Sequence, residues 1–322
     1  MAKSRALEDT LAELHRLRDD PTSASAAGTL RRVLAGKLSH AIAKAAQIIG
    51  EFEMAQLTPE LVAAFDRLMI NPVKTDPTCS AKTQIAEALY RMGADAEATF
   101  LRGVRHVQLE PVWGGKADTA AALRGACALG LVRISAADAM VELADLLADP
   151  APTARIAAAR AIAYSENQHG VPLLRLKVRS GDDDPTVIAE CLSALLHLVP
   201  ASSVSFVASL LDAPEPAMRE TAALALGGSR LPEALAVLRT WWDRAPEPDL
   251  RRTALLAIAM LKRDEAIEFL LSLVGEAPGP AARDAIAALA LYRHDDSISR
   301  RVREIVERRD DVDLRAALAT AF

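Results

Sequence analysis

Apolar positions in the C-terminal half of the chain recur at helical spacing inside a longer repeat. In the segment PAMRETAALALGG (216–228), Met218, Ala222, Ala225 and Leu226 fall at i, i+4, i+7 and i+8, which places them on one face of a helix. Proline opens the segment and glycine ends it, as both residues commonly do in helices. The same phrase returns as PTARIAAARAIA, PDLRRTALLAIA and PAARDAIAALAL.

The repeat has a fixed period of 32 residues, counted on one position that holds Arg155, Val187, Arg219, Arg251, Arg283 and Arg315. More apolar helices, such as DAMVELADLLAD and EAIEFLLSLV, alternate with the alanine-rich ones. A period of roughly 20 to 50 residues is typical of stacked repeat proteins, in which each unit buries its apolar face against the next. The pattern therefore predicts an all-α solenoid built from helix pairs.

The N-terminal part follows the same rhythm less regularly. A first amphipathic helix is expected over 4–19, and residues 1–38 are predicted to cap the first repeat, since solenoid ends need a cover. Residues 39–322 then form the solenoid as one elongated domain. The repeat position falls at Ile42, Lys82 and Ala122 before it reaches Arg155, which gives intervals of 40, 40 and 33 residues. Each of the first two intervals exceeds the period by eight residues (40 − 32). The extra residues are predicted to lie in longer loops at 70–79 and 107–118.

An acidic residue precedes several of the repeat arginines. Acid near a helix start is favoured by the helix dipole, and a recurring acid–arginine pair is expected to form a structural ladder along the stack. The predicted pairs are Asp149–Arg155, Asp212–Arg219, Glu276–Arg283 and Asp310–Arg315.

The phrase D-P-x-x-R-x-x-A-A-x-A-L-G, as in DPAPTARIAAARAIA and APEPAMRETAALALG, resembles the bacterial HEAT-like repeat first described in phycobilisome lyases. The resemblance extends over residues 39–322. It implies a right-handed superhelix of about nine helix pairs, whose alanine-rich helices line a concave binding surface. It says little about function, because solenoids of this kind serve many tasks.

Composition narrows the classes of function. The chain is 51% hydrophobic but only 4% aromatic, which favours helices over strands. Its net charge of −5 (38 − 43), with both signs mixed, disfavours non-specific binding to nucleic acid or to anionic membranes. No run approaches the roughly 20 apolar residues that cross a bilayer, and no signal peptide is evident. The widely spaced Cys79, Cys127 and Cys191 favour a reduced, cytoplasmic protein.

The two loops are the main candidates for a functional site, because long irregular segments in a compact repeat often carry function. Since they occupy the same place in successive repeats, we expect them to lie side by side on one edge. Trp113 before two glycines is the expected aromatic anchor. The alternative is that the loops only cover a gap in the stack. The predicted partner-binding residues of this edge are Lys74, Asp76, Lys82, Arg105, His106, Glu110, Trp113, Lys116 and Asp118.

Two arginines of the alanine-rich helices complete the predicted set. The first and fifth positions after the repeat arginine vary between repeats, and Arg252 and Arg160 occupy them. These variable positions are expected to face either a partner or solvent on the concave side.

Catalytic and metal-binding motifs are not recognisable. Asp76, Cys79, Arg105, His106 and Glu110 could in principle form a Cys–His pair or a metal site. However, the sequence contains no HExxH, CxxC pair or GxSxG, and the remaining histidines lack ligand spacing. We therefore predict a non-enzymatic protein with no metal and no cofactor.

Three functions compete at this level. The first is an interaction scaffold that binds a protein or peptide on the concave face and on the edge at 71–79 and 105–118. The second, implied by the repeat family, is a lyase-like or chaperone-like protein that acts on a cofactor- or chromophore-bearing protein. The third is a HEAT-like DNA glycosylase or other nucleic-acid binder, suggested by Trp241, Trp242 and Asp243.

The glycosylase hypothesis is disfavoured by the acidic net charge and by the lack of a basic groove. One of the two tryptophans is instead expected to pack between repeats, with the other partly exposed. Because the last repeat stops at Phe322, self-association through the C-terminal face is a further hypothesis.

Overall fold

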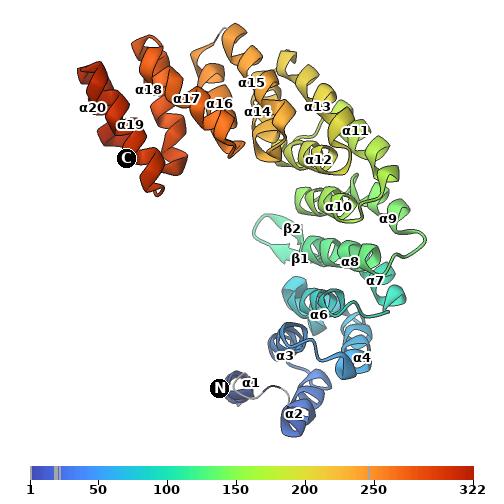
Figure 1. Cartoon of the computed structure of the whole chain (residues 1–322). Coiled ribbons are helices and arrows are strands. Elements are labelled where there is room, and N and C mark those ends of the chain that lie inside the picture. The colour runs from blue at the N-terminus through green and yellow to red at the C-terminus, as the bar shows by residue number, and fades with distance from the viewer. Residues whose placement is uncertain (1, 18–20, 22, 246) are drawn as a thin grey trace. The chain divides into compact units, whose positions relative to one another are not determined.

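The computed structural model describes residues 2–17, 21, 23–245 and 247–322, and helices make up nearly all of its regular structure (Figure 1). The chain forms two compact units, residues 1–170 and 171–322. In each unit helix pairs stack around a core that is rich in alanine, leucine and isoleucine.

The first unit is organised around one row of successive helices, α3 (Ser39–Glu51), α6 (Ser80–Arg91), α8 (Ala121–Arg133) and α10 (Pro152–Tyr164). Helices α4 (Thr58–Leu68), α7 (Glu97–Val104) and α9 (Ala139–Leu146) each pack on the row helix that follows them. Near the N-terminus, α1 (Ala2–Arg16) and α2 (Ala24–Leu34) both contact α3. Short turns complete the unit: η2 (Ala55–Leu57), α5 (Pro72–Thr75), η3 (Pro77–Cys79) and η4 (Gln168–Gly170).

The second unit repeats the same arrangement. Its row consists of α12 (Pro185–Leu198), α14 (Pro216–Ser229), α16 (Pro248–Met260), α18 (Gly279–Leu289) and α20 (Val312–Ala321). The flanking helices are α11 (Val171–Ser180), α13 (Pro200–Ser209), α15 (Pro232–Arg244), α17 (Asp264–Glu276) and α19 (Asp296–Arg309), with short turns η5 (Leu210–Asp212) and η6 (Ala290–Tyr292). The predicted all-α solenoid of helix pairs is confirmed.

Helix starts follow the proline rhythm of the sequence. Pro152, Pro185, Pro216 and Pro248 each stand in the first turn of a row helix, where the missing N–H would lack a partner in any case. The helix expected over 4–19 is α1, which ends at Arg16. Its expected end at residue 19 lies outside the described part of the chain. The boundary between a cap at 1–38 and a solenoid from 39 stays a prediction.

Neighbouring row helices approach each other so closely that a side chain is excluded at some positions. A Cβ on Gly227 of α14 would lie 2.3 Å from the carbonyl oxygen and 2.8 Å from the Cα of Ala257 on α16. In the first unit, a Cβ on Gly50 of α3 would lie 2.8 Å from the Cα of Ala88 on α6. This backbone proximity explains why glycine and alanine meet at these contacts between row helices.

Some repeat arginines bind the following repeat rather than the acid that precedes them. The predicted pair Asp310–Arg315 is present, whereas Asp212 pairs with Arg244. Exposed pairs of this kind contribute about 0–1 kcal/mol each, so they add little to the stability of the stack. The pairs between repeats are Arg219–Glu247 at 3.4 Å and Arg283–Asp313 at 3.3 Å.

The segment predicted as a loop at 107–118 is a β-hairpin. Strands β1 (Leu109–Val112) and β2 (Gly115–Asp118) pair antiparallel, with Leu109 opposite Asp118 and Val112 opposite Gly115. The connecting turn is Trp113-Gly114, and Gly114 has the positive φ of 85° that the second central residue of a type II turn requires. The other predicted loop, 70–79, contains the two single turns α5 and η3.

We expect Gly227→Ala to destabilise the second unit by about 1–3 kcal/mol, because the new methyl group meets the backbone of α16. Gly228→Ala is the matched control, since its Cβ would have only the terminal methyl of Met260 nearby, at 3.9 Å. That control should leave stability equal or raise it by up to about 1 kcal/mol, the helix preference of alanine over glycine. Urea unfolding of both variants measures the difference; a Gly227→Ala protein as stable as the control would contradict the close approach.

Candidate partner-binding edge

The two segments predicted to be neighbours lie side by side in the first unit. The Nε2 of Gln108 donates to the carbonyl oxygen of Asp76 at 2.9 Å, and the Thr78 N–H donates to Oε1 of Glu110 at 2.7 Å. Residues 71–79 and 105–118 therefore form one continuous surface region, called the hairpin edge below.

Asp76 and Lys82, predicted to contact a partner, are instead buried. The Lys82 Nζ lies 2.9 Å from Oδ2 of Asp76, and both side chains are 0% exposed. The carboxylate also accepts the backbone N–H groups of Ala81 and Lys82, at 3.0 and 2.9 Å. It thus closes the N-terminus of α6, where a negative charge is favoured. The pair fixes segment 71–79 on α6 and is not available to a partner.

A second buried charge, Arg124 on α8, holds the hairpin. Its guanidinium lies 2.7 Å from Oδ2 of Asp118, donates to the carbonyl oxygen of His106 at 2.9 Å and donates to Oδ1 of Asp149 at 2.8 Å. Asp118 ends β2, His106 precedes β1, and Asp149 belongs to the next repeat. One side chain therefore ties both ends of the hairpin to the stack.

The repeat spacing places Ala122, not Arg124, at the repeat position, so the sequence does not predict the role of Arg124. The structure aligns Arg124 with Lys82, since each basic residue is buried and stands six residues after a carboxylate that it contacts. Arg155 follows Asp149 at the same interval and donates to its carbonyl oxygen at 2.8 Å. The recurring spacing of six, from Asp to Lys or Arg, was the signal in the sequence.

The carboxylate of Asp118 is saturated by hydrogen bonds. It accepts the backbone N–H groups of Gln108 and Ala120, both at 3.0 Å, in addition to Arg124. Burial acts to raise the pKa of Asp118, but the bonds from Arg124, Ala120 and Gln108 outweigh it and hold the pKa below its usual value. Asp118 is therefore an ionised structural group.

Glu110 on β1 is likewise a carboxylate engaged in structural hydrogen bonds. Its Oε1 accepts the Thr78 N–H, the Gln108 Nε2 and the Thr119 hydroxyl, each at 2.7 Å. Burial acts to raise the pKa of Glu110, yet these three bonds lower it overall. The carboxylate is directed into the contact between the hairpin and segment 71–79.

Arg105 and His106 join the base of the hairpin to the helices around it. The Nε of Arg105 donates to Oε2 of Glu142 on α9 at 2.9 Å, and this bond raises the pKa of Arg105. His106 is half-buried, and its Nε2 lies 3.2 Å from Oε1 of Gln108. Burial lowers the pKa of His106.

Several apolar side chains of the hairpin and of the segment before it are exposed. Trp113 at the tip is 103% exposed, and Val107, Leu109 and Val112 are 57%, 53% and 50% exposed. Lys116 on β2 is exposed as well and has no ion-pair partner among the described residues. The same holds for Lys74 in the neighbouring segment.

Arg160 and Arg252 lie outside the hairpin edge. Both are exposed, Arg160 on α10 of the first unit and Arg252 on α16 of the second. Arg252 pairs with Asp249 of its own helix. Their role in binding stays a prediction.

The backbone of segment 71–79 contains three non-glycine residues in the left-handed region. Asn71, Thr78 and Cys79 have φ values of 53°, 65° and 59°. Such conformations cost roughly 1–3 kcal/mol each and persist where the surroundings fix them. Here the Thr78 N–H is fixed by Glu110 of the hairpin, so the two segments constrain each other.

The groups considered for catalysis are unsuited to it. Cys79 is buried, and burial raises the pKa of its thiol to about 12, whereas nucleophiles and metal ligands react as thiolates. Asp76 and Glu110 are engaged in structural bonds. Across the described residues, no three His, Cys, Asp or Glu side chains are grouped so as to hold a metal ion.

Trp241 and Trp242 adopt the expected roles. Trp241 is buried, and its indole N–H donates to the carbonyl oxygen of Leu211 at 3.1 Å. Trp242 is partly exposed and meets the ring of Phe269 edge-on, with centroids 5.9 Å apart. A buried, hydrogen-bonded Trp241 cannot stack on a nucleobase, which removes one residue that suggested a glycosylase.

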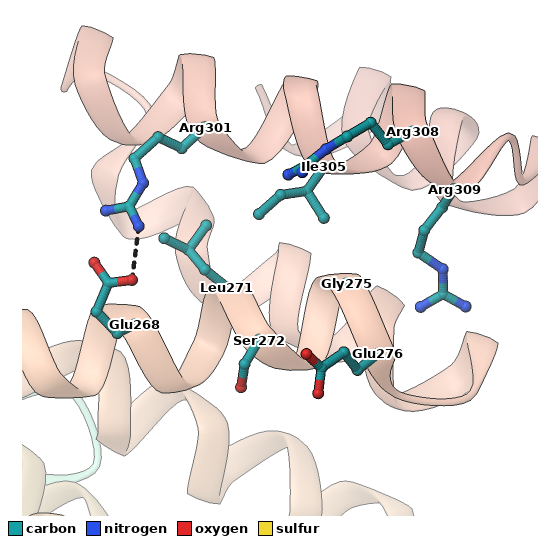
Figure 2. A pocket seen from close by; sticks show the side chains of 9 residues that line it. All are labelled: Glu268, Leu271, Ser272, Gly275, Glu276, Arg301, Ile305, Arg308 and Arg309. Atoms are coloured by element: carbon teal, nitrogen blue, oxygen red, sulfur yellow. Dashed lines mark hydrogen bonds and ion pairs between the residues drawn. The ribbon is translucent and has the colours of Figure 1, made fainter.

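A shallow hollow of about 430 Å³ lies between α17 and α19 of the second unit (Figure 2). It exists because Gly275 has no side chain opposite Ile305. At one end Glu268 binds Arg301 at 2.7 Å, and at the other the Nη1 of Arg309 donates to the carbonyl oxygen of Ala277 at 2.7 Å. Glu268, Arg301 and Arg309 are thus bonded to the protein itself.

Comparison with known proteins supports the architecture. Residues 171–248 match the family model of HEAT repeats. Together with the helix pairs of both units, this match supports a HEAT-like repeat architecture. No curated protein matches the chain. No helix in the described part of the chain is long and apolar enough to cross a membrane.

Solved structures of helical proteins share parts of the arrangement. The complex of CpcE and CpcF of phycocyanin lyase from Nostoc sp. PCC7120 matches with 18% identity over 80% of this chain and 94% of that chain, with a TM-score of 0.38. An engineered protein matches with 18% identity over 96% and 90%, with a TM-score of 0.40. Human deoxyhypusine hydroxylase matches with 16% identity over 91% and 99%, with a TM-score of 0.31. These scores are too low to carry an argument about this chain.

The free energy of unfolding of the first unit should fall as the pH is lowered below about 6.5, where an unfolded histidine takes up a proton. Burial keeps the pKa of His106 lower in the folded state, so the unfolded chain binds more protons there and stability rises with pH. Urea unfolding at a series of pH values should show a flatter dependence for His106→Gln than for the wild type. His169→Gln, which replaces an exposed histidine of the same unit, is the control; equal slopes for all three proteins would refute the expectation.

Proposed function

We propose that this HEAT-like repeat protein is a non-enzymatic scaffold that binds a protein or peptide at the hairpin edge. The observation that carries the proposal is the fully exposed Trp113 at the tip of a hairpin whose base is held by buried charges. Tryptophan is enriched among the residues that dominate binding energy. An indole kept in water at the end of a fixed projection is poorly explained by folding alone.

The anchoring of the hairpin supports a binding role more than a gap-filling one. A segment that only covered the stack would turn its apolar side chains inward, whereas Leu109 and Val112 are 53% and 50% exposed. Arg124 and Glu110 fix the strands from below, so the exposed side chains are held in place before a partner arrives. Such preorganisation reduces the entropy lost on binding.

The other hypotheses have less support. The lyase-like or chaperone-like role rests on the repeat resemblance, and a repeat fold does not determine function. The concave-face contribution of Arg160 and Arg252, self-association through the C-terminal face and a cytoplasmic location likewise stay predictions.

Replacement of Trp113 tests the proposal. Immobilised wild-type chain should retain specific proteins from an extract of its source cells, and Trp113→Ala should reduce their recovery at least about tenfold, which corresponds to 1.4 kcal/mol. Leu176→Ala is the matched control, because Leu176 is another large apolar side chain, 64% exposed, on α11 of the second unit. If Trp113→Ala recovers the same proteins in the same yield as wild type and Leu176→Ala, the hairpin edge is not the binding site.

A further inference from the structure

We infer that the partner contributes an extended, acidic segment that adds to β2 as a third strand. This inference rests on the proposed function and specifies the conformation and the charge of what binds. It follows from the register of the hairpin, from one proline and from the distribution of paired and unpaired charges.

The register shows which backbone groups remain open. The Thr119 N–H donates to the carbonyl oxygen of Gln108 at 3.0 Å, so these two residues form a hydrogen-bonded pair. Pairs alternate along an antiparallel ladder, and Pro111–Lys116 is therefore a non-hydrogen-bonded pair. The N–H and C=O of Lys116 point away from β1. An open row of this kind is a template for another strand.

Pro111 distinguishes the two edges of the hairpin. It lies directly opposite Lys116 and has no N–H, so the outer edge of β1 lacks a donor at its centre. The side chains of Gln108, which precedes β1, and of Glu110 on β1 also bind segment 71–79. β2 has neither restriction, and Figure 1 shows the hairpin projecting beside α8.

The distribution of charges at the hairpin edge indicates that the added segment is acidic. The carboxylates of Asp76, Glu110 and Asp118 all accept bonds from the protein itself. Lys116, in contrast, is exposed and unpaired within the described residues. A carboxylate across the strand from Lys116 would contribute about 0.2–1 kcal/mol, and an apolar neighbour would cover Trp113 or Val112.

In strand addition, the backbone and the side chains contribute differently to recognition. Main-chain hydrogen bonds to β2 provide affinity for any extended segment, while side-chain contacts select the sequence. A two-stranded hairpin is marginally stable in isolation, so a third strand also stabilises the site that it occupies. The expected ligand is thus an extended peptide with acidic and apolar residues in alternation.

A random octapeptide library displayed on phage, selected on the full chain, provides the probe. We expect enriched sequences with acidic and apolar residues in alternation. Synthetic copies, measured by fluorescence anisotropy, should bind Lys116→Pro about tenfold more weakly, because the edge donor and the charge are both lost. Lys37→Pro is the matched control, since it makes the same substitution at an exposed lysine of the first unit that lies outside the hairpin edge, and it should leave affinity unchanged.

Lys116→Glu reverses the charge but keeps every backbone donor. It is therefore the decisive variant if Lys116→Pro disturbs the hairpin. It should weaken acidic peptides and strengthen copies in which lysine replaces the acidic residues. Failure to enrich any peptide, enrichment of basic peptides, or equal affinity for wild type, Lys116→Pro and Lys116→Glu would overturn the inference. If those variants bind normally while Trp113→Ala does not, the proposed function stands without strand addition. If Trp113→Ala also binds normally, both are wrong.

Discussion

The hairpin edge depends on one buried guanidinium. Arg124 joins the end of β2 through Asp118, the approach to β1 through the His106 carbonyl and the next repeat through Asp149. Two short strands with an exposed tip bury too little apolar surface to fix themselves. Breaking a buried ion pair leaves an uncompensated charge, at a cost of about 3–5 kcal/mol, so the hairpin position is coupled to the stability of the stack.

The close packing of the row helices explains where extra residues can be accommodated. Gly227 against Ala257, and Gly50 against Ala88, leave no space for a side chain, far less for an insertion. Added residues must therefore enter between helices, at the N-terminal approach to a row helix. Segments 71–79 and 105–118 stand at that place before α6 and α8, and each is fastened by a carboxylate six residues ahead of a buried basic residue.

The sequence was sufficient to predict what depends on local signals. Period, proline starts and the alanine face are repeated many times, so the helix pairs and the neighbouring position of the two inserted segments could be inferred. The hairpin could not, because each strand has four residues and Pro111 argues against a strand. The sequence predicts Asp76 and Lys82 at the surface because charged residues are seldom buried unless paired, and their pairing depends on the turn at 71–79. Trp113 could be predicted as an anchor from local sequence, because it is a large aromatic residue next to turn-forming glycines.

The central claim is that Arg124 orders the hairpin before any partner binds, and hydrogen exchange tests it most directly. In the wild type, the amides of Gln108 and Thr119, which donate to Asp118 and to the Gln108 carbonyl, should be protected from exchange. In Arg124→Met their protection should fall at least about tenfold, equivalent to 1.4 kcal/mol of local opening, while the amides of α14 and α16 in the second unit keep theirs. Equal protection of Gln108 and Thr119 in both proteins would contradict the account.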